Sequence, residues 1–591
     1  MSRTRRHGSW MASYQKAWLA GDLTAGLIVT VMLIPQSLAY AMLAGLPPEV
    51  GLYASMLPIV AYALLGSSMT LAVGPVAVAS LMTASALQAL AAPGSAAYTL
   101  LAVHLALLSG LLLLAMSALR LGFLAHFLSH PVISGFISGS AILIAVGQLK
   151  HLFGVHTVGT GALEMLPSVL RALPAAQPAT LAIGLGSLAV LWVARKWLAS
   201  ALQRLGCSAR VADLSAKLAP MAAVIATTAL VAVGRLDLTY GVSVVGVVPQ
   251  GLPQLQLALP SPSVMAQLWM PALLIALVGF VESVSVAQSL ALRRGQRITP
   301  NRELLGLGAA NVASALSGGY PVTGGFARSV VNFAAGANTP LAGIVSAVLM
   351  AMVMIAFTDW FYYLPHAVLA ATIIVAVTSL IDVNALREAW RYDRADAWCL
   401  LATATGVVAA GVEAGILIGI GLSLGVLVWR SSHPHMAVLG RVSGTMQFRN
   451  VLRHPAQTQP GLLLLRVDES LHFANISAVE EHIESLLTAD PAIRRVVLSC
   501  SAVNRIDATA LMALTELERV LQQRGIDLAL AEIKGPVMDR LRHTELLQRL
   551  QERVFASLQE AVGWATSCPV PTPEHPLQEP RPSLQLPSDL R

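Results

Sequence analysis

Apolar stretches dominate the chain up to residue 432, and short polar or Gly/Pro-rich breaks separate them. A transmembrane helix needs about 20 predominantly apolar residues, and most of these stretches reach or approach that length. The pattern therefore predicts an all-α polytopic membrane domain with fourteen spans. The approximate spans are 22–44, 50–67, 75–92, 96–118, 126–149, 178–198, 212–233, 266–292, 303–317, 323–336, 340–358, 365–381, 396–411 and 413–430.

The pattern changes after residue 432. Short aliphatic runs, such as RRVVLSCS at 494–501, alternate with amphipathic runs, such as VEEHIESLLTAD at 479–490. This alternation predicts an α/β domain with helices packed on a sheet. The expected organisation is a leader at 1–20, a transmembrane domain at 21–432, an α/β domain at 436–565 and a disordered Pro-rich tail at 566–591.

Composition and charge agree with this division, because the 591 residues are 55% hydrophobic and only 12% charged. Residues 1–433 hold 22 Lys/Arg and 13 Asp/Glu, whereas the remainder holds 16 and 18, so the membrane domain supplies the net charge of +7. Its basic residues gather in alternate loops, which the positive-inside rule assigns to the cytoplasm. An even number of spans then places both termini and the α/β domain in the cytoplasm, and we expect no nucleic-acid partner.

Enzymatic chemistry finds no support in the residue pattern. The cysteines at 207, 399, 500 and 568 lack metal or disulfide spacing. No nucleophile with a base, pair of carboxylates or metal cluster stands out, so we expect a protein that is not an enzyme and has no catalytic residues, cofactor or metal.

The membrane domain repeats three short words in the same order. PQSLAYA at 35–41 recurs as AQSLALR at 287–293, LSHPVISG at 128–135 as LPHAVLAA at 364–371, and GPVAVAS at 74–80 as YPVTGGF at 320–326. The offsets are 252, 236 and 246 residues. Similar offsets indicate two halves of seven spans each. Because seven is odd, the second half must be inverted relative to the first.

The third and tenth spans are short and follow Gly/Pro stretches, so each is expected to be a half-helix that begins at membrane depth. A helix N-terminus carries partial positive charge and unpaired N–H groups, which bind anions. Arg328, in YPVTGGFARS, adds a full charge and planar donors suited to an oxyanion. The sequence also allows two structural roles for Arg328, because its side chain could extend to the membrane interface or pair with a structural carboxylate.

Two long segments carry a family resemblance. LIPQSLAYAMLAGLPPEVGLYASMLPIVAYALLGSSMTLAVGPVAVASLM at 33–82 and PVTGGFARSVVNFAAGANTPLAG at 321–343 resemble the SulP sulfate permease family, whose animal members form solute carrier family 26. The resemblance covers roughly residues 20–565. It implies a seven-plus-seven inverted repeat with core and gate domains, secondary anion transport by alternating access, a cytoplasmic STAS domain and a homodimer. We expect the bacterial inner membrane as the location.

The resemblance also implies which residues contact the substrate. These residues lie at the first, third and tenth spans: Gln36, Tyr40, Val76, Ala77, Phe326, Ala327 and Arg328. Ala327 replaces a serine that members of the family often have, so one hydroxyl donor is missing. Met69 stands where the family commonly has Lys or Arg.

Glu282 is a second charge inside an apolar span, and ionised insertion there costs roughly 2.5 to 3.5 kcal/mol. The resemblance implies that Glu282 is the proton-coupling carboxylate. A static pair between Glu282 and Arg328 is the alternative. His130 and His366 stand beside prolines at equivalent repeat positions, and we assign both to structural roles at helix starts.

The expected function is proton-coupled uptake of sulfate or a similar oxyanion. Alternatives within the family are bicarbonate and C4-dicarboxylate transport. Alternatives outside it are a nucleobase transporter of the same membrane fold and a non-transporting sensor that signals through the STAS domain.

In the STAS domain, Ala508 stands where bacterial members of that domain family have a phosphorylatable serine. This excludes phosphorylation at position 508 and leaves Thr509 as a substitute.

Overall fold

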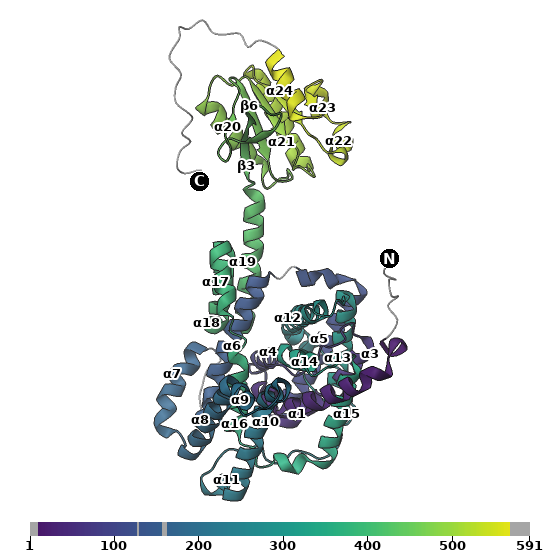
Figure 1. Ribbon diagram of the computed structural model, residues 1–591, viewed down its shortest axis with the longest axis vertical. Helices are drawn as coiled ribbons and strands as arrows, with labels where there is room; N and C mark the ends of the chain where they lie inside the picture. Colours follow the sequence, from purple (N-terminus) through teal and green to yellow (C-terminus); the bar gives the residue numbers. More distant parts are fainter. Residues whose placement is uncertain (1–9, 127–128, 156–161, 568–591) are drawn as a thin grey trace. The chain divides into compact units, whose positions relative to one another are not determined.

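The computed structural model describes residues 10–126, 129–155 and 162–567. The chain divides into two compact units, residues 1–423 and 424–591, each with hydrophobic clusters of its own (Figure 1). The first nine residues of the predicted leader and nearly all of the predicted tail, residues 568–591, lie outside the described residues.

The first unit is helical, and every predicted span contains a helix. The second span is broken into two helices, α2 and α3. By length and apolar composition, eight helices of the described residues suffice to cross a membrane. The helices are α1 Leu19–Leu43, α2 Pro48–Tyr53, α3 Leu57–Leu65, α4 Ala77–Leu87, α5 Ala96–Ala118, α6 His130–Phe153, α7 Ala162–Ala172, α8 Pro178–Val193, α9 Ala199–Arg204, α10 Ala209–Gly234, α11 Leu236–Thr239, α12 Pro262–Leu292, α13 Pro300–Leu316, α14 Phe326–Ala334, α15 Leu341–Ala356, α16 His366–Thr378, α17 Val383–Tyr392, α18 Arg394–Ala410 and α19 Val412–Ser432.

Contacts between these helices define two bundles. In one, α5 packs against α12 and α13, and α3 and α1 pack against α15. In the other, α6 packs against α16 and α18, and α8 packs against α10 and α16 (Figure 1). The bundles correspond to the core and gate domains that the family resemblance implies, and the predicted all-α polytopic architecture is confirmed.

The repeat words mark equivalent helices, with one correction. Helices α6 and α16 begin at His130 and His366, which is the offset of 236 residues expected from the words. Helices α4 and α14 begin at residues 77 and 326, which are 249 apart rather than 246. The word match was therefore wrong by three residues here. The matched prolines are Pro75 and Pro321, and α4 begins two residues after Pro75 whereas α14 begins five residues after Pro321. Val76 is the structural equivalent of Gly325, not of Val322.

Two short strands meet where the half-helices begin. Strand β1 (Val73–Gly74) pairs antiparallel with β2 (Thr323–Gly324). The N–H of Gly325 extends the pairing by donating to the carbonyl of Ala72 at 3.0 Å. Antiparallel pairing of equivalent segments is what two oppositely oriented halves produce. It also satisfies backbone groups that a membrane interior cannot solvate.

Buried carboxylates fasten the loops next to this crossing. Glu303, in the first turn of α13, accepts hydrogen bonds from Tyr62 Oη (2.6 Å), the backbone N of Ser67 and Ser68 (both 2.9 Å) and Ser67 Oγ (2.5 Å). Asp22, in the first turn of α1, accepts from the backbone N of Asn338 and Thr339. One carboxylate therefore fixes the loop that leads into β1, and the other fixes the loop that leaves α14.

The second unit is an α/β domain built on a seven-stranded sheet. The strand order is β4-β3-β6-β7-β8-β9, with β5 pairing beside β3; β6 to β9 run parallel and β3 runs antiparallel to β6. Its elements are β3 Met436–Val442, β4 Phe448–Asn450, β5 Ala456–Gln457, β6 Leu462–Val467, α20 Ile476–Ala489, β7 Arg495–Ser499, α21 Ala508–Gln523, β8 Asp527–Ala531, α22 Gly535–Leu541, α23 Glu545–Leu550, β9 Val554–Phe555 and α24 Leu558–Ser567.

Side chains of the sheet alternate between two apolar layers, as the strand period of two requires. Leu463 and Leu465 join the layer that includes α20 and α21, whereas Leu462 and Leu464 join the layer under α24. Helix α21 begins at Ala508, and Asp507 caps it by accepting a hydrogen bond from the backbone N of Ala510 at 2.8 Å.

We expect Glu303→Ala to lower the thermal unfolding midpoint of the purified protein. The substitution leaves buried donors of Tyr62, Ser67 and Ser68 without an acceptor, and each such donor costs about 1–3 kcal/mol. The matched control is Glu388→Ala on α17, because Glu388 is exposed. Equal midpoint shifts in the two variants would contradict the anchoring role of Glu303.

Candidate functional site

The candidate site lies where the two half-helices begin. Helix α4 follows Val76 and α14 follows Gly325, and no side chain in the described part of the chain caps either helix. The β1–β2 pairing brings these two starts together. Each start presents N–H groups with partial positive charge, so the pair favours an anion nearby.

Arg328 stands in the first turn of α14 and is only 3% exposed. Its Nη1 donates to the carbonyl of Pro75 at 2.6 Å, whereas Nε and Nη2 have no partner among the described residues. The side chain does not extend to an interface, and no carboxylate of the described residues pairs with it. Arg328 therefore fills neither of the two structural roles that the sequence allowed, and two of its donors are available.

Glycines give the guanidinium its space. A Cβ at Gly325 would stand 3.1 Å from Arg328 Nη2 and 3.2 Å from Val76 Cγ1. A Cβ at Gly74 would stand 3.3 Å from the same nitrogen, and Gly74 has a φ of +153°, which side-chain-bearing residues rarely adopt. Glycine at positions 74 and 325 thus allows the backbone to approach the Arg328 guanidinium closely.

A cavity of about 350 Å³ lies beside this arrangement, between α1 and α14 of one bundle and α8, α10 and α16 of the other. Gln36, Tyr40 and Ala327 line it, as does Arg195 from the π-helical segment Ala194–Leu198. Arg195 Nη1 donates to the carbonyl of Val375 at 2.5 Å. Three of the seven residues expected to contact substrate therefore share one cavity.

The other four expected residues lie around the half-helix starts. Arg328 lies within electrostatic range of the Tyr40 hydroxyl. Val76 and Ala77 are buried at the start of α4. The side chain of Phe326 is 50% exposed and is not among the residues that line the cavity.

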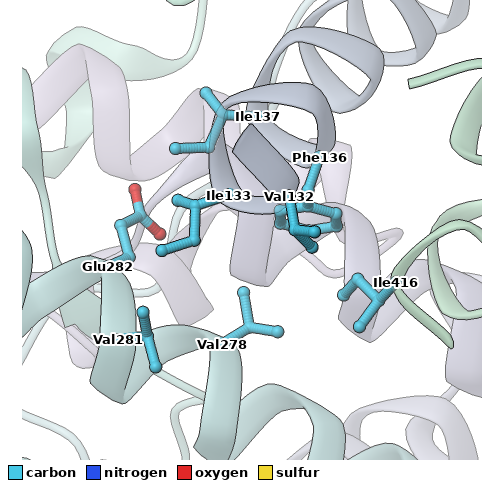
Figure 2. A pocket seen from close by; sticks show the side chains of 8 residues that line it. All are labelled: Val132, Ile133, Phe136, Ile137, Val278, Val281, Glu282 and Ile416. Carbon is cyan, nitrogen blue, oxygen red and sulfur yellow. The ribbon is translucent and has the colours of Figure 1, made fainter. Parts of the chain in front are cut away.

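Glu282 lies on α12, within electrostatic range of Arg328 and Tyr40. Figure 2 shows its carboxylate beside Ile133 and Ile137 of α6. The hollow next to it holds about 20 Å³, and every other lining residue is apolar: Val132, Ile133, Phe136, Ile137, Val278, Val281 and Ile416. Within the described residues no ion pair joins Glu282 to Arg328, so the static pair is not formed here.

Several polar residues at the site were missed by reading the sequence. Ser283 Oγ accepts from the backbone N of Gly324 at 2.8 Å, and Tyr320 Oη shares a 2.9 Å hydrogen bond with Ser80 Oγ. Asn311 bonds both polar groups of the Val322 backbone at 2.9 and 3.0 Å. In the sequence, these residues could have been recognised as isolated polar residues in apolar stretches close to a Gly/Pro break.

The geometry therefore defines a membrane transporter: two bundles, a crossing of half-helices and a cavity between the bundles. Comparison with known proteins agrees. Residues 19–403 match the sulfate permease family and residues 454–561 match the STAS domain. The chain belongs to the sulfate permease family, which confirms the resemblance and the expectation of a transporter rather than an enzyme.

Relatives match nearly the whole chain. Sulfate transporter 4.1, chloroplastic, of Arabidopsis thaliana is 34% identical over 568 residues, which are 94% of this chain and 81% of the relative. A probable sulfate transporter of Mycobacterium tuberculosis is 36% identical over 552 residues, which are 93% and 96% of the two chains.

Solved structures share the fold. Murine Slc26a9 in the inward-facing state has a TM-score of 0.84 and 22% identity, with 96% of this chain and 97% of that chain covered. The transmembrane domain of the cyanobacterial bicarbonate transporter BicA has a TM-score of 0.57 and 22% identity, and it covers 70% of this chain and 99% of its own.

We expect Ser283→Ala to destabilise the protein by about 1–3 kcal/mol, because the buried N–H of Gly324 loses its acceptor. Ser285→Ala, two residues along the same helix, is the matched control. The hydroxyl of Ser285 donates to the carbonyl of Val281 at 2.8 Å, and the residue is exposed. Thermal unfolding of both variants tests this, and a loss in Ser285→Ala as large as in Ser283→Ala would contradict it.

Proposed function

We propose that this protein is a secondary active transporter that takes up sulfate, or a similar oxyanion, together with a proton. One observation carries the proposal: Arg328 is buried between two helix starts, and among the described residues its Nε and Nη2 have no hydrogen-bond partner. The names of the sulfate transporters that match over more than nine tenths of this chain support the same substrate.

The chemistry of this site favours an anion with several oxygens. A guanidinium donates two parallel hydrogen bonds to a carboxylate or tetrahedral oxyanion, and the helix starts add further N–H donors. A dianion gains most from such fixed positive charge, which favours sulfate over bicarbonate. A neutral nucleobase does not need a desolvated arginine. Gln36, Tyr40, Val76, Ala77, Phe326 and Ala327 complete the proposed substrate contacts.

The position of the cavity between the two bundles supports alternating access. When the core bundle moves against the gate bundle, the anion at the half-helix starts meets the opposite side of the membrane. Arg195 belongs to a basic segment that the positive-inside rule places in the cytoplasm, so the cavity that Arg195 lines opens inward. The likeness to an inward-facing structure supports this orientation.

Glu282 is the proposed proton carrier. Anion uptake into a negative cell costs about 2.3 kcal/mol per charge for each 100 mV, and a co-transported proton offsets one charge. Glu282 lies among apolar side chains of α6 and α12 and close enough to Arg328 for their charges to interact. Protonated, Glu282 leaves Arg328 free for the anion; ionised, it competes for Arg328 and favours release.

The proposal extends to the assembly: a homodimer in the bacterial inner membrane, with both termini and the STAS domain in the cytoplasm. The alternating basic loops support the orientation, and the mycobacterial relative supports a bacterial membrane.

Uptake of labelled sulfate, bicarbonate, C4-dicarboxylates and a nucleobase into proteoliposomes, each with and without a pH gradient, tests the substrate class. Absence of flux for every compound would favour a sensor instead.

Arg328→Ala is expected to weaken sulfate binding more than tenfold while the protein still inserts. A charge-assisted hydrogen bond at a desolvated site contributes on the order of 1.5 to 3 kcal/mol. Arg328→Lys keeps the charge but lacks the planar donors, so its affinity should fall between the two. Equilibrium binding to purified protein measures this, with Arg387→Ala on the exposed helix α17 as the control. Unchanged affinity in Arg328→Ala would reject the proposed site.

Glu282→Gln is expected to retain sulfate binding but lose stimulation by an inward proton gradient, because glutamine resembles the protonated side chain and cannot release a proton. Exchange or slow uncoupled flux should remain. The measurement is labelled sulfate uptake at an acidic and a neutral exterior. Equal acid stimulation in wild type and variant would show that the proton binds elsewhere.

A further inference from the structure

A second basic cavity occurs in the STAS domain, apart from any residue used in transport. It holds about 380 Å³ and lies where β3, β4 and β6 meet. Its lining is almost entirely cationic or polar: His435, Arg449, Asn450, Arg453, His454, Arg466 and Asp468. Cavities of a few hundred Å³ accommodate small molecules, so this one has room for more than a single inorganic ion.

Asp468 is the acidic residue of the lining, and its charge is already compensated. It accepts hydrogen bonds from Arg466 Nε (2.5 Å) and Nη2 (3.0 Å) and from His435 Nδ1 (2.8 Å). Partial burial opposes ionisation, but the hydrogen bonds from Arg466 and His435 outweigh it and hold the pKa of Asp468 below its ordinary range. The bonds fix Arg466 and His435 in place, and the pair of Arg466 and Asp468 is close to neutral.

Arg449 and Arg453 are left uncompensated. Among the described residues no carboxylate lies within ion-pair distance of either guanidinium, and both side chains are exposed. Arg449 Nη2 donates to the neutral Gln447 Oε1 at 3.3 Å. Five other arginines of the same domain are each held by a carboxylate: Arg519, Arg524, Arg542, Arg549 and Arg553. Arg441 and Arg494 instead donate to backbone carbonyls. What sets Arg449 and Arg453 apart is that both guanidiniums lack a carboxylate partner among the described residues and line the same cavity.

The ligand chemistry follows from these donors. Guanidinium groups bind phosphoryl oxygens through two parallel hydrogen bonds, and a phosphate monoester carries close to two negative charges near neutral pH. His454 and the free edge of His435 add ring nitrogens, and Asn450 adds an amide. A carboxylate offers fewer oxygens and half the charge, so it suits this set of donors less well.

We propose that this cavity of the STAS domain binds a phosphate monoester group. The monoester has two sources. One is a soluble phosphorylated metabolite. The other is a lipid headgroup, since His435 follows the end of α19 by three residues, a distance of at most about 10 Å along the chain. The proposal does not depend on which anion is transported.

The test uses purified full-length protein and titration calorimetry. The soluble probe is glycerol phosphate, and the lipid probe is a short-chain phosphatidic acid, with short-chain phosphatidylcholine for comparison. We expect saturable binding of at least one monoester probe and none of phosphatidylcholine. Arg449→Ala/Arg453→Ala should raise the Kd at least tenfold, and Arg449→Lys/Arg453→Lys should raise it less.

Matched variants separate this site from other causes. Arg519→Ala/Arg524→Ala removes two positive charges elsewhere on the same domain and should leave the Kd unchanged. Arg328→Ala should also leave it unchanged, because Arg328 lies in the other unit. Binding to phosphatidic acid alone assigns the lipid source, and binding to glycerol phosphate assigns the soluble source. The proposal is overturned if no monoester binds, if the control raises the Kd equally, or if Arg328→Ala abolishes the signal.

Discussion

The pairing of β1 with β2 is the interaction on which the transport unit depends. A backbone that leaves helical geometry inside a membrane domain must find partners for its N–H and C=O groups, because lipid supplies none. Here the two broken segments hydrogen-bond to each other. Ser283 and Asn311 bind backbone groups of Gly324 and Val322 that the short β1–β2 pairing does not use. Glu303 and Asp22 then hold the flanking loops from α13 and α1. Removing the crossing would leave polar backbone unpaired in both halves at once.

The same crossing creates the electrostatics of the site. Two helix starts are held side by side without capping side chains, so their N–H groups stay directed at a common space. Arg328 is held by a neutral carbonyl, that of Pro75, rather than by a carboxylate, so its charge is not cancelled. Gly74 and Gly325 keep the backbone close to the guanidinium. Preorganised positive charge in a desolvated setting is what distinguishes an anion site from a surface arginine.

The STAS domain follows different physical rules. Its sheet places alternate side chains in two apolar layers, so ordinary hydrophobic burial stabilises it without any membrane. Its basic cavity relies on several exposed arginines with one compensated aspartate, whereas the transport unit relies on a single buried arginine. The two proposed anion sites thus differ in kind: the one in the membrane unit uses a desolvated charge, and the one in the STAS domain uses several donors at the surface.

Hydrophobic pattern determined the helical spans and the change to an α/β domain, because burial in lipid or under a sheet leaves a local pattern in the sequence. The repeated words added the equivalence of the helices that begin at His130 and His366. The hydrophobic pattern also singled out Arg328 and Glu282 as charges in apolar surroundings. Only the tertiary structure decided the three-residue shift at the half-helices, the anchoring role of Glu303 and the absence of a pair between Glu282 and Arg328. Each of these depends on residues some 50 to 250 positions apart along the chain. A side chain's partner is set by how helices pack, and helix packing leaves no periodic signal in one sequence.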